Sequence, residues 1–311
     1  MPIDYTTTEL VNSVKRRITV PTSQNFFLPD NIVSYANDEM FSTIMNAIVS
    51  VQEEYFVTSA DTPIVAGTTS YRIPARAAGG MLRDVVMVDT NGNEVAVPRI
   101  APEVVKSPVF SRNSGPLSGV LIKDDSVILI PDSTPFATFS IRMKFMRRPN
   151  NLVITSKAGK ILSVNQGANQ VVLQSVPSFF TTTLTYDIIR GTPTFTSSGD
   201  DLVVTNISGN TITFAALPLG ITIGSYLSEA GTSPIPQIPY EAHHPLAQLT
   251  AATMLDATGD KKNAEVIFAK GKDMLDGFLK LVTPRIEGTG TKVNNRNGIF
   301  SQVGRSGFFG W

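Results

Sequence analysis

The chain has 311 residues, with 26 Lys and Arg, 26 Asp and Glu, and no cysteine. The lack of cysteine excludes disulfides, thiolate catalysis and Cys-ligated metal sites. The zero formal net charge removes the simplest case for a nucleic-acid or anionic-membrane binder, which needs a basic surplus. The length suffices for about two domains, and we expect proteins as partners.

The N-terminus lacks a basic region followed by an apolar run. No stretch reaches the roughly 20 apolar residues that a membrane span needs. We therefore expect a soluble chain without a targeting segment.

Two helices are predicted at the start of the chain. Hydroxyl side chains at Thr6 to Thr8 can cap a short amphipathic helix that ends at Val20-Pro21. Pro29-Asp30 predicts the start of a second helix, with Asp30 as its cap, and an apolar stripe continues it from Ile32 to Tyr55.

After Asp61 the apolar period changes from helical to alternating, which predicts β-structure. Asn91-Gly92 is the strongest hairpin signal, because both residues tolerate positive φ, and Asp124-Asp125 is the next. The predicted strands are Ser70 to Ile73, Arg83 to Asp89, Glu94 to Pro98, Gly119 to Lys123, Ser126 to Ile130 and Thr138 to Phe145.

From Leu152 to Gly231 the chain is rich in Thr, Val, Ser, Gly and Asn, which predicts a second, small β unit inserted into the first architecture. The Pro-rich segment Ser233 to Pro239 is interpreted as an extended spacer. Strands are predicted at Lys160 to Asn165, Gln170 to Gln174, Leu184 to Arg190, Leu202 to Asn206 and Thr211 to Phe214.

Two more helices follow. One begins near Pro245 and stops at Gly259, and Asp260 caps the next, which continues to Val282. Because each helix has a single apolar stripe, we expect the first two to pack against the last two. The predicted fold class is α+β: N- and C-terminal helices form an antiparallel helical bundle, antiparallel β domains are inserted between them, and an extended C-terminal arm follows. The predicted helical bundle comprises residues 1–60 and 240–283. The first β domain is expected at 61–151, the inserted β unit with its Pro-rich linker at 152–239, and the arm at 284–311.

The sequence offers little for catalysis. Glu241, His243 and His244 are the one cluster of metal-ligand types, but adjacent helical histidines point about 100° apart, so a partly buried histidine at a helix start is favoured over a metal site. The pairs Asp124-Asp125 and Asp200-Asp201 are interpreted as turn residues. No Gly-x-Ser-x-Gly elbow occurs, and Gly288 to Lys292 lacks the flanking strand and helix of a phosphate loop. We therefore expect no enzyme, cofactor or metal.

Two basic concentrations remain. Arg142, Lys144, Arg147 and Arg148 could meet an acidic partner or DNA, although a solvated strand edge is favoured. The tail alternates cations with aromatic and aliphatic residues, the types that anchor interfaces, and we interpret it as a binding arm rather than a disordered terminus. Its predicted contact residues are Arg285, Lys292, Arg296, Ile299, Phe300, Arg305, Phe308, Phe309 and Trp311.

The whole pattern resembles the head-to-tail adaptor (connector) proteins of tailed bacteriophages, including the tail tubular A type. The resemblance covers most of the chain apart from Leu152 to Gly231. The segments that carry it are the opening helix, Pro29 to Met40, Tyr71 to Pro74, Leu82 to Val85, Val127 to Pro131, Arg147 to Pro149, the helix pair around Gly259-Asp260 and the arm.

The resemblance implies a virion protein at the portal vertex, assembled in the host cytoplasm. It implies a homo-oligomeric, dodecameric ring through which genomic DNA passes, with the arm on the portal protein and the β parts toward tail tube, nozzle or fibre proteins. The alternatives are a tail-spike or fibre-attachment protein with a receptor-binding β module, a nucleic-acid binder that uses Arg142 to Arg148, and a hydrolase that uses Asp124, Asp125 or His243.

Overall fold

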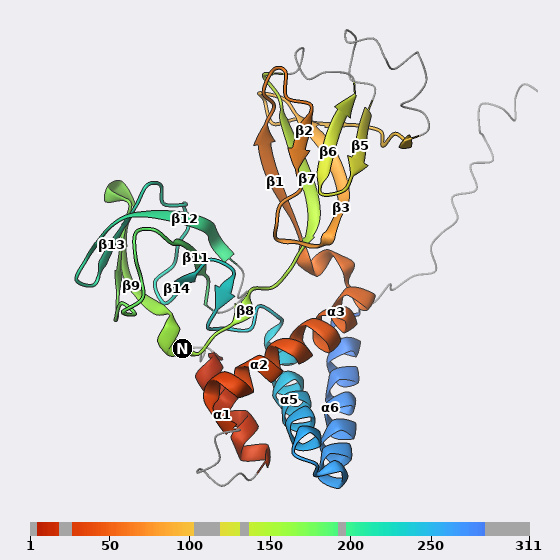
Figure 1. Cartoon of the computed structure of the whole chain (residues 1–311), viewed down its shortest axis with the longest axis vertical. Coiled ribbons are helices and arrows are strands. Elements are labelled where there is room, and N and C mark those ends of the chain that lie inside the picture. Colours follow the sequence, from red (N-terminus) through yellow and green to blue (C-terminus); the bar gives the residue numbers. More distant parts are fainter. Residues whose placement is uncertain (1–4, 19–26, 103–118, 131–136, 192–196, 284–311) are drawn as a thin grey trace, which may run out of the picture.

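A computed structural model describes residues 5–18, 27–102, 119–130, 137–191 and 197–283 (Figure 1). These residues form fifteen strands and five α-helices, and all but one of the strand pairs are antiparallel. The predicted fold class is therefore wrong: the chain is mostly β, not a helical bundle with β insertions. The predicted fold class gave too much weight to the helices, because their apolar periodicity is strong and local. Several strands have no periodic pattern, and their conformation depends on partners far away in the sequence.

The helices lie at the two ends of the chain and largely follow the predicted stripes. Their bounds are α1 Thr7–Ile18, α2 Pro29–Glu39, α3 Met45–Val51, α5 His243–Ala257 and α6 Lys261–Val282. The predicted second helix is not uniform, because a π-helical turn, Met40–Ile44, separates α2 from α3. Asp30 does not cap it, since Leu28 holds the cap position without a side-chain bond. The cap of α6 is confirmed, with Asp260 accepting from the Asn263 amide.

One β unit, here called the sheet unit, consists of two sheets that pack around one core. The first sheet has the order β1-β7-β3-β4 and the second β2-β6-β5. Both predicted hairpins are confirmed, with positive φ at Gly92 and Asp124 in their turns. The strands are β1 Val57–Pro63, β2 Ser70–Arg72, β3 Ala77–Val88, β4 Glu94–Ala96, β5 Gly119–Lys123, β6 Ser126–Ile130 and β7 Ser140–Arg147.

The second β unit is a closed barrel with strand order β10-β13-β12-β11-β14-β9. Its interior is filled by side chains such as Tyr186, Ile188 and Ile212, none of which is exposed. The barrel strands are β9 Gly159–Asn165, β10 Gln170–Leu173, β11 Thr185–Ile189, β12 Ser197–Ser208, β13 Thr211–Phe214 and β14 Tyr226–Glu229. A short parallel pair, β8 Asn151–Leu152 with β15 Thr232–Ser233, lies beside it.

The helices share one hydrophobic core that joins distant parts of the chain. Leu10 of α1, Ile32 of α2 and Leu246 of α5 are all fully buried in it. The Pro-rich segment after β15 is not the expected spacer, because Ile235 and Ile238 within it are also fully buried. Among the described residues, three large cores therefore lie in the helices, the sheet unit and the barrel, and a fourth, small cluster consists of Ala158, Tyr226 and Ile235. The domain boundaries given above remain a prediction.

Candidate functional site

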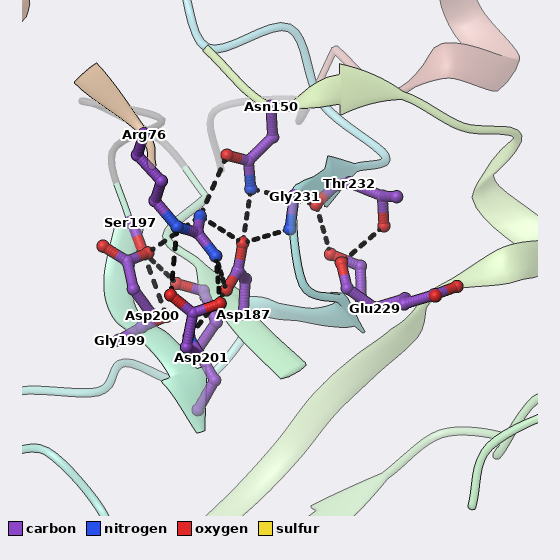
Figure 2. Close-up of polar contacts among 12 residues, drawn as sticks. Arg76, Asn150, Asp187, Ser197, Gly199, Asp200, Asp201, Glu229, Gly231 and Thr232 are labelled. Carbon is purple, nitrogen blue, oxygen red and sulfur yellow. Dashed lines mark hydrogen bonds and ion pairs between the residues drawn. The ribbon is translucent and has the colours of Figure 1, made fainter. Parts of the chain in front are cut away.

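A cluster of arginine and aspartate side chains connects the sheet unit to the barrel (Figure 2). Arg76 lies just before β3, and its guanidinium forms a bidentate salt bridge with Asp187 of β11. Nη1 donates to Oδ2 at 2.7 Å and Nη2 donates to Oδ1 at 2.8 Å. We call this cluster of Arg76, Arg147, Asp187, Asp200 and Asp201 the joint.

Asp187 is a carboxylate without exposed surface in the middle of the apolar strand β11. Three further donors reach it: the Asn150 side-chain amide at 2.7 Å, the Asp201 backbone amide at 3.0 Å and the Gly231 backbone amide at 2.9 Å. Burial of a charge is tolerated only when it is paired and its lone pairs are satisfied. These contacts meet that condition.

A β-bulge places two more carboxylates opposite Asp187. The β11–β12 register steps from Tyr186–Leu202 to Ile188–Gly199, so Asp187 alone faces Asp200 and Asp201. Asp201 adopts a φ of 53° there. The pair predicted as turn residues therefore lies within β12, and the prediction of a turn at Asp200-Asp201 is wrong.

The arginines neutralise this acidic side of the barrel. Arg76 also donates a hydrogen bond to Asp201 at 2.7 Å. Arg147, at the end of β7, donates to both carboxylate oxygens of Asp200 at 2.6 Å. Burial alone would lower the pKa of Arg76, but the bonds to Asp187 and Asp201 outweigh it and raise that pKa. Burial likewise would raise the pKa of Asp200, whereas Arg147 and Ser197 bring it below its ordinary value. Arg76 and Asp200 therefore stay charged at neutral pH.

An open cleft of about 640 Å³ adjoins the joint, where the helices, the sheet unit and the barrel meet. Phe41 of the π-helical turn and Met45 of α3 form its apolar wall, and Arg76, Arg148 and Gly231 contribute to the polar side. Arg148 is exposed, and among the residues that the structure describes no carboxylate lies within ion-pair distance of its guanidinium. The π-helical turn bordering the cleft is a feature often found at functional sites.

The predicted basic patch is divided between two environments. Arg142 bonds Asp61 at 2.7 Å and Glu94 at 2.8 Å, and Lys144 bonds Glu94 at 2.6 Å across the first sheet. Arg147 belongs to the joint, which leaves Arg148 as the member of the patch without an ion pair among the described residues. A role for this patch toward DNA or an acidic partner remains a prediction.

His243 lies at the start of α5, as expected, but it is fully buried and not partly buried. Its Nε2 is 3.2 Å from the carbonyl oxygens of both Pro236 and Ile238. Because carbonyls only accept, we assign the proton to Nε2. Within the described ranges, no group of three or more His, Asp or Glu residues is arranged to hold a metal ion.

Burial lowers the pKa of His243 to about 4. In the unfolded chain this imidazole gains its proton near pH 6.5, so the folded state binds fewer protons between pH 6.5 and 4. We expect the free energy of unfolding to fall as the pH is lowered through this window. Urea unfolding at pH 7, 6 and 5 checks this, and His243→Gln is expected to flatten the dependence. An equally steep pH dependence in the variant would contradict the assignment.

Sequence reasoning missed Arg76, Asn150 and Asp187. A usable signal was present at Asp187, since a single acid in the strand Thr185–Ile189 requires a buried partner. The predicted arm residues, Arg285 to Trp311, lie outside the described residues.

No helix among the described residues is both long and apolar enough to cross a membrane. In comparisons with known proteins, no protein-family model matches this chain, and no curated protein is significantly similar to it.

Proposed function

We propose that this protein is a structural head-to-tail adaptor of a tailed-phage virion. It forms a ring under the portal, joins the capsid vertex to the tail and lets DNA pass, without catalysing a reaction. The observation that carries the proposal is the joint, because Arg76 and Arg147 hold two separately cored β units together through five charged side chains. An adaptor must keep its shape while it contacts partners on several surfaces, and such a joint supplies that rigidity.

The spatial arrangement and the resemblance support the same role. The sheet unit and the barrel project from the helices in different directions (Figure 1). A single copy can therefore present separate surfaces to a neighbouring copy, to the portal and to tail proteins. The segments that resemble connector proteins include Pro29 to Met40 and Arg147 to Pro149, which contribute to the helices and to the joint.

The arm is proposed as the portal contact. It follows α6 directly and carries Phe300, Phe308, Phe309 and Trp311. Burying one such side chain contributes about 1.5–3 kcal/mol before the entropic cost of ordering the segment, so several anchors must act together.

Removal of residues 289–311 tests this role. We expect the truncated chain to assemble like the full chain but no longer to co-sediment with portal assemblies. A full-length variant with Phe308, Phe309 and Trp311 replaced by Ala is the matched control, because it removes the aromatic side chains but keeps the length of the arm. We expect it to lose most of the portal binding. Undiminished portal binding by the truncated chain would rule out the arm. The mass of the particle is a second readout, because a fibre-attachment protein predicts a trimer or hexamer instead of a large ring.

A further inference from the structure

Strand β1 has one side without a backbone partner among the described residues. It lies at the edge of the first sheet and pairs only with β7 (Figure 1). Every other described strand of five or more residues has neighbours on both sides, because the barrel is closed and β5 meets β6 on one side and Arg99 on the other. In the described part of the molecule, β1 is therefore the long strand edge that can take a further strand.

The register of β1 shows which of its backbone groups face outward. The Ile64 amide donates to the Phe139 carbonyl at 2.9 Å, and this pair continues the β1–β7 register. Hydrogen-bonded and non-hydrogen-bonded positions alternate in an antiparallel pair, so the even-numbered residues of β1 point their amides toward β7, whereas Ser59 and Asp61 point theirs away. Both residues are exposed, and neither amide has a hydrogen-bond partner within the described ranges.

The features that discourage strand addition are weak at this edge. A charged side chain on an edge strand opposes pairing, but the Asp61 carboxylate is already held by Arg142, with both hydrogen bonds 2.7 Å long. Pro63 lacks an amide and therefore closes only the last position of the strand. The edge from Val57 to Asp61 remains open to an extended partner.

Residues 298–304 of the arm have the composition of such a partner. The segment carries no charge and no proline, it contains Ile299, Phe300 and Val303, which favour β-structure, and a glycine bounds it at each end. Its place in the chain is also suitable, because α6 ends beside α3 and the 3₁₀ turn Glu53–Phe56 leads from α3 into β1 (Figure 1). Residues 284–297 can extend about 45 Å, and β1 is about 23 Å long, so the segment can reach β1 of its own chain.

We propose that residues 298–304 of the arm add to β1 of the same chain as a further strand of the first sheet. Carbonyls of the added strand accept from the outward amides of Ser59 and Asp61. The linker within one chain gives the segment a high effective concentration at this edge. The added strand is independent of the portal contact, because Phe308, Phe309 and Trp311 follow it in the chain and stay available to a partner.

Hydrogen–deuterium exchange resolved to single amides tests the added strand in the full-length protein. We expect the amides of Ser59 and Asp61 to exchange roughly ten times more slowly than in the chain without residues 289–311, because a strand hydrogen bond must open before its amide exchanges. The amides of Thr58 and Ala60 bond to β7 in both proteins, so they are internal controls for the fold and should not change.

Proline substitution separates the proposed strand from the rest of the arm. Phe300→Pro with Ser301→Pro removes two successive amides, and one of the two must face β1 because successive amides of a strand point to opposite sides. We expect this full-length variant to exchange at the two outward amides of β1 like the truncated chain. Asn294→Pro with Asn295→Pro is the matched control, since it places two prolines in the arm outside the segment, and it should behave like wild type.

Equal exchange at Ser59 and Asp61 in the full-length and truncated chains would overturn the inference, as would unchanged protection in the variant with prolines at 300 and 301. Protection that disappears on dilution would mean that the strand comes from another copy, and would overturn the assignment to the same chain. Failure of the added strand is distinguishable from failure of the proposed function. If the truncation abolishes portal binding without changing the exchange, the adaptor role stands and the added strand is wrong. If the proline variant exposes both amides while the truncation leaves portal binding intact, the added strand stands and the arm's portal role is wrong.

Discussion

Replacing Arg76 by Met is expected to lower the free energy of unfolding by about 3–5 kcal/mol, because it leaves a buried carboxylate without its cation. Asp187 would keep its three amide donors but lose both guanidinium bonds, with Asp200 and Asp201 beside it. Met retains much of the aliphatic packing, so the loss reports on charge. Urea unfolding followed by circular dichroism measures it, and the transition of the sheet unit and the barrel is expected to shift most.

Arg72→Met is the matched control. Arg72 lies four residues earlier in the same segment, and its ion pair with Asp125 is 3.1 Å long but exposed on both sides. Solvent screening makes such pairs nearly neutral for stability, so we expect almost no change. The double variant Arg76→Met with Asp187→Leu is expected to recover much of the loss, since a well-packed apolar pair can replace a buried ion pair. Equal effects of Arg76→Met and Arg72→Met would contradict the assigned role of the joint.

Replacing Gly271 by Leu is expected to lower the free energy of unfolding by about 1–3 kcal/mol through overpacking. Gly271 of α6 lies directly against Leu249 and Gln248 of α5. A Cβ there would lie 2.9 Å from Leu249 Cδ2 and 3.3 Å from Gln248 Cγ, so the larger side chain must push the helices apart. Thermal unfolding by circular dichroism measures the change.

Gly277 offers a control on the same helix. A Cβ at Gly277 meets no atom within 4 Å, so Gly277→Ala is expected to stabilise the protein by about 0.5–1 kcal/mol through helix propensity alone. If Gly271→Leu lowers the free energy of unfolding and Gly277→Ala raises it, then close helix packing, and not helix propensity, requires the glycine at 271. Stabilisation by both would mean that α5 and α6 can separate without cost.

The sequence predicted the features that depend on neighbouring residues. The turns at Asn91-Gly92 and Asp124-Asp125 require positive φ and short polar side chains, and the cap at Asp260 requires an acceptor three residues before an amide. Such signals are complete within a few residues. They identified many elements but not how much of the chain is β.

The features that failed depend on distant partners. Strand β1 has no alternating apolar pattern, and its conformation follows from seven paired residues on β7, more than 75 positions away in the chain. Asp200-Asp201 resembles a turn locally, yet Arg76 and Arg147 draw both carboxylates across to the sheet unit. Arg76 and Asp187 are 111 residues apart, so no local pattern could pair them.

The helical core also sets an order for folding during synthesis. All six barrel strands lie between Gly159 and Glu229, so the barrel can close as soon as that stretch has left the ribosome. The apolar faces of α1 and α2 must wait for α5, since Arg17 reaches its partner Gln248 across 231 positions. Chains that emerge with such faces uncovered are prone to aggregation. Nascent protein that contains α1 and α2 but not yet α5 is therefore the stage at which we expect the greatest need for chaperones.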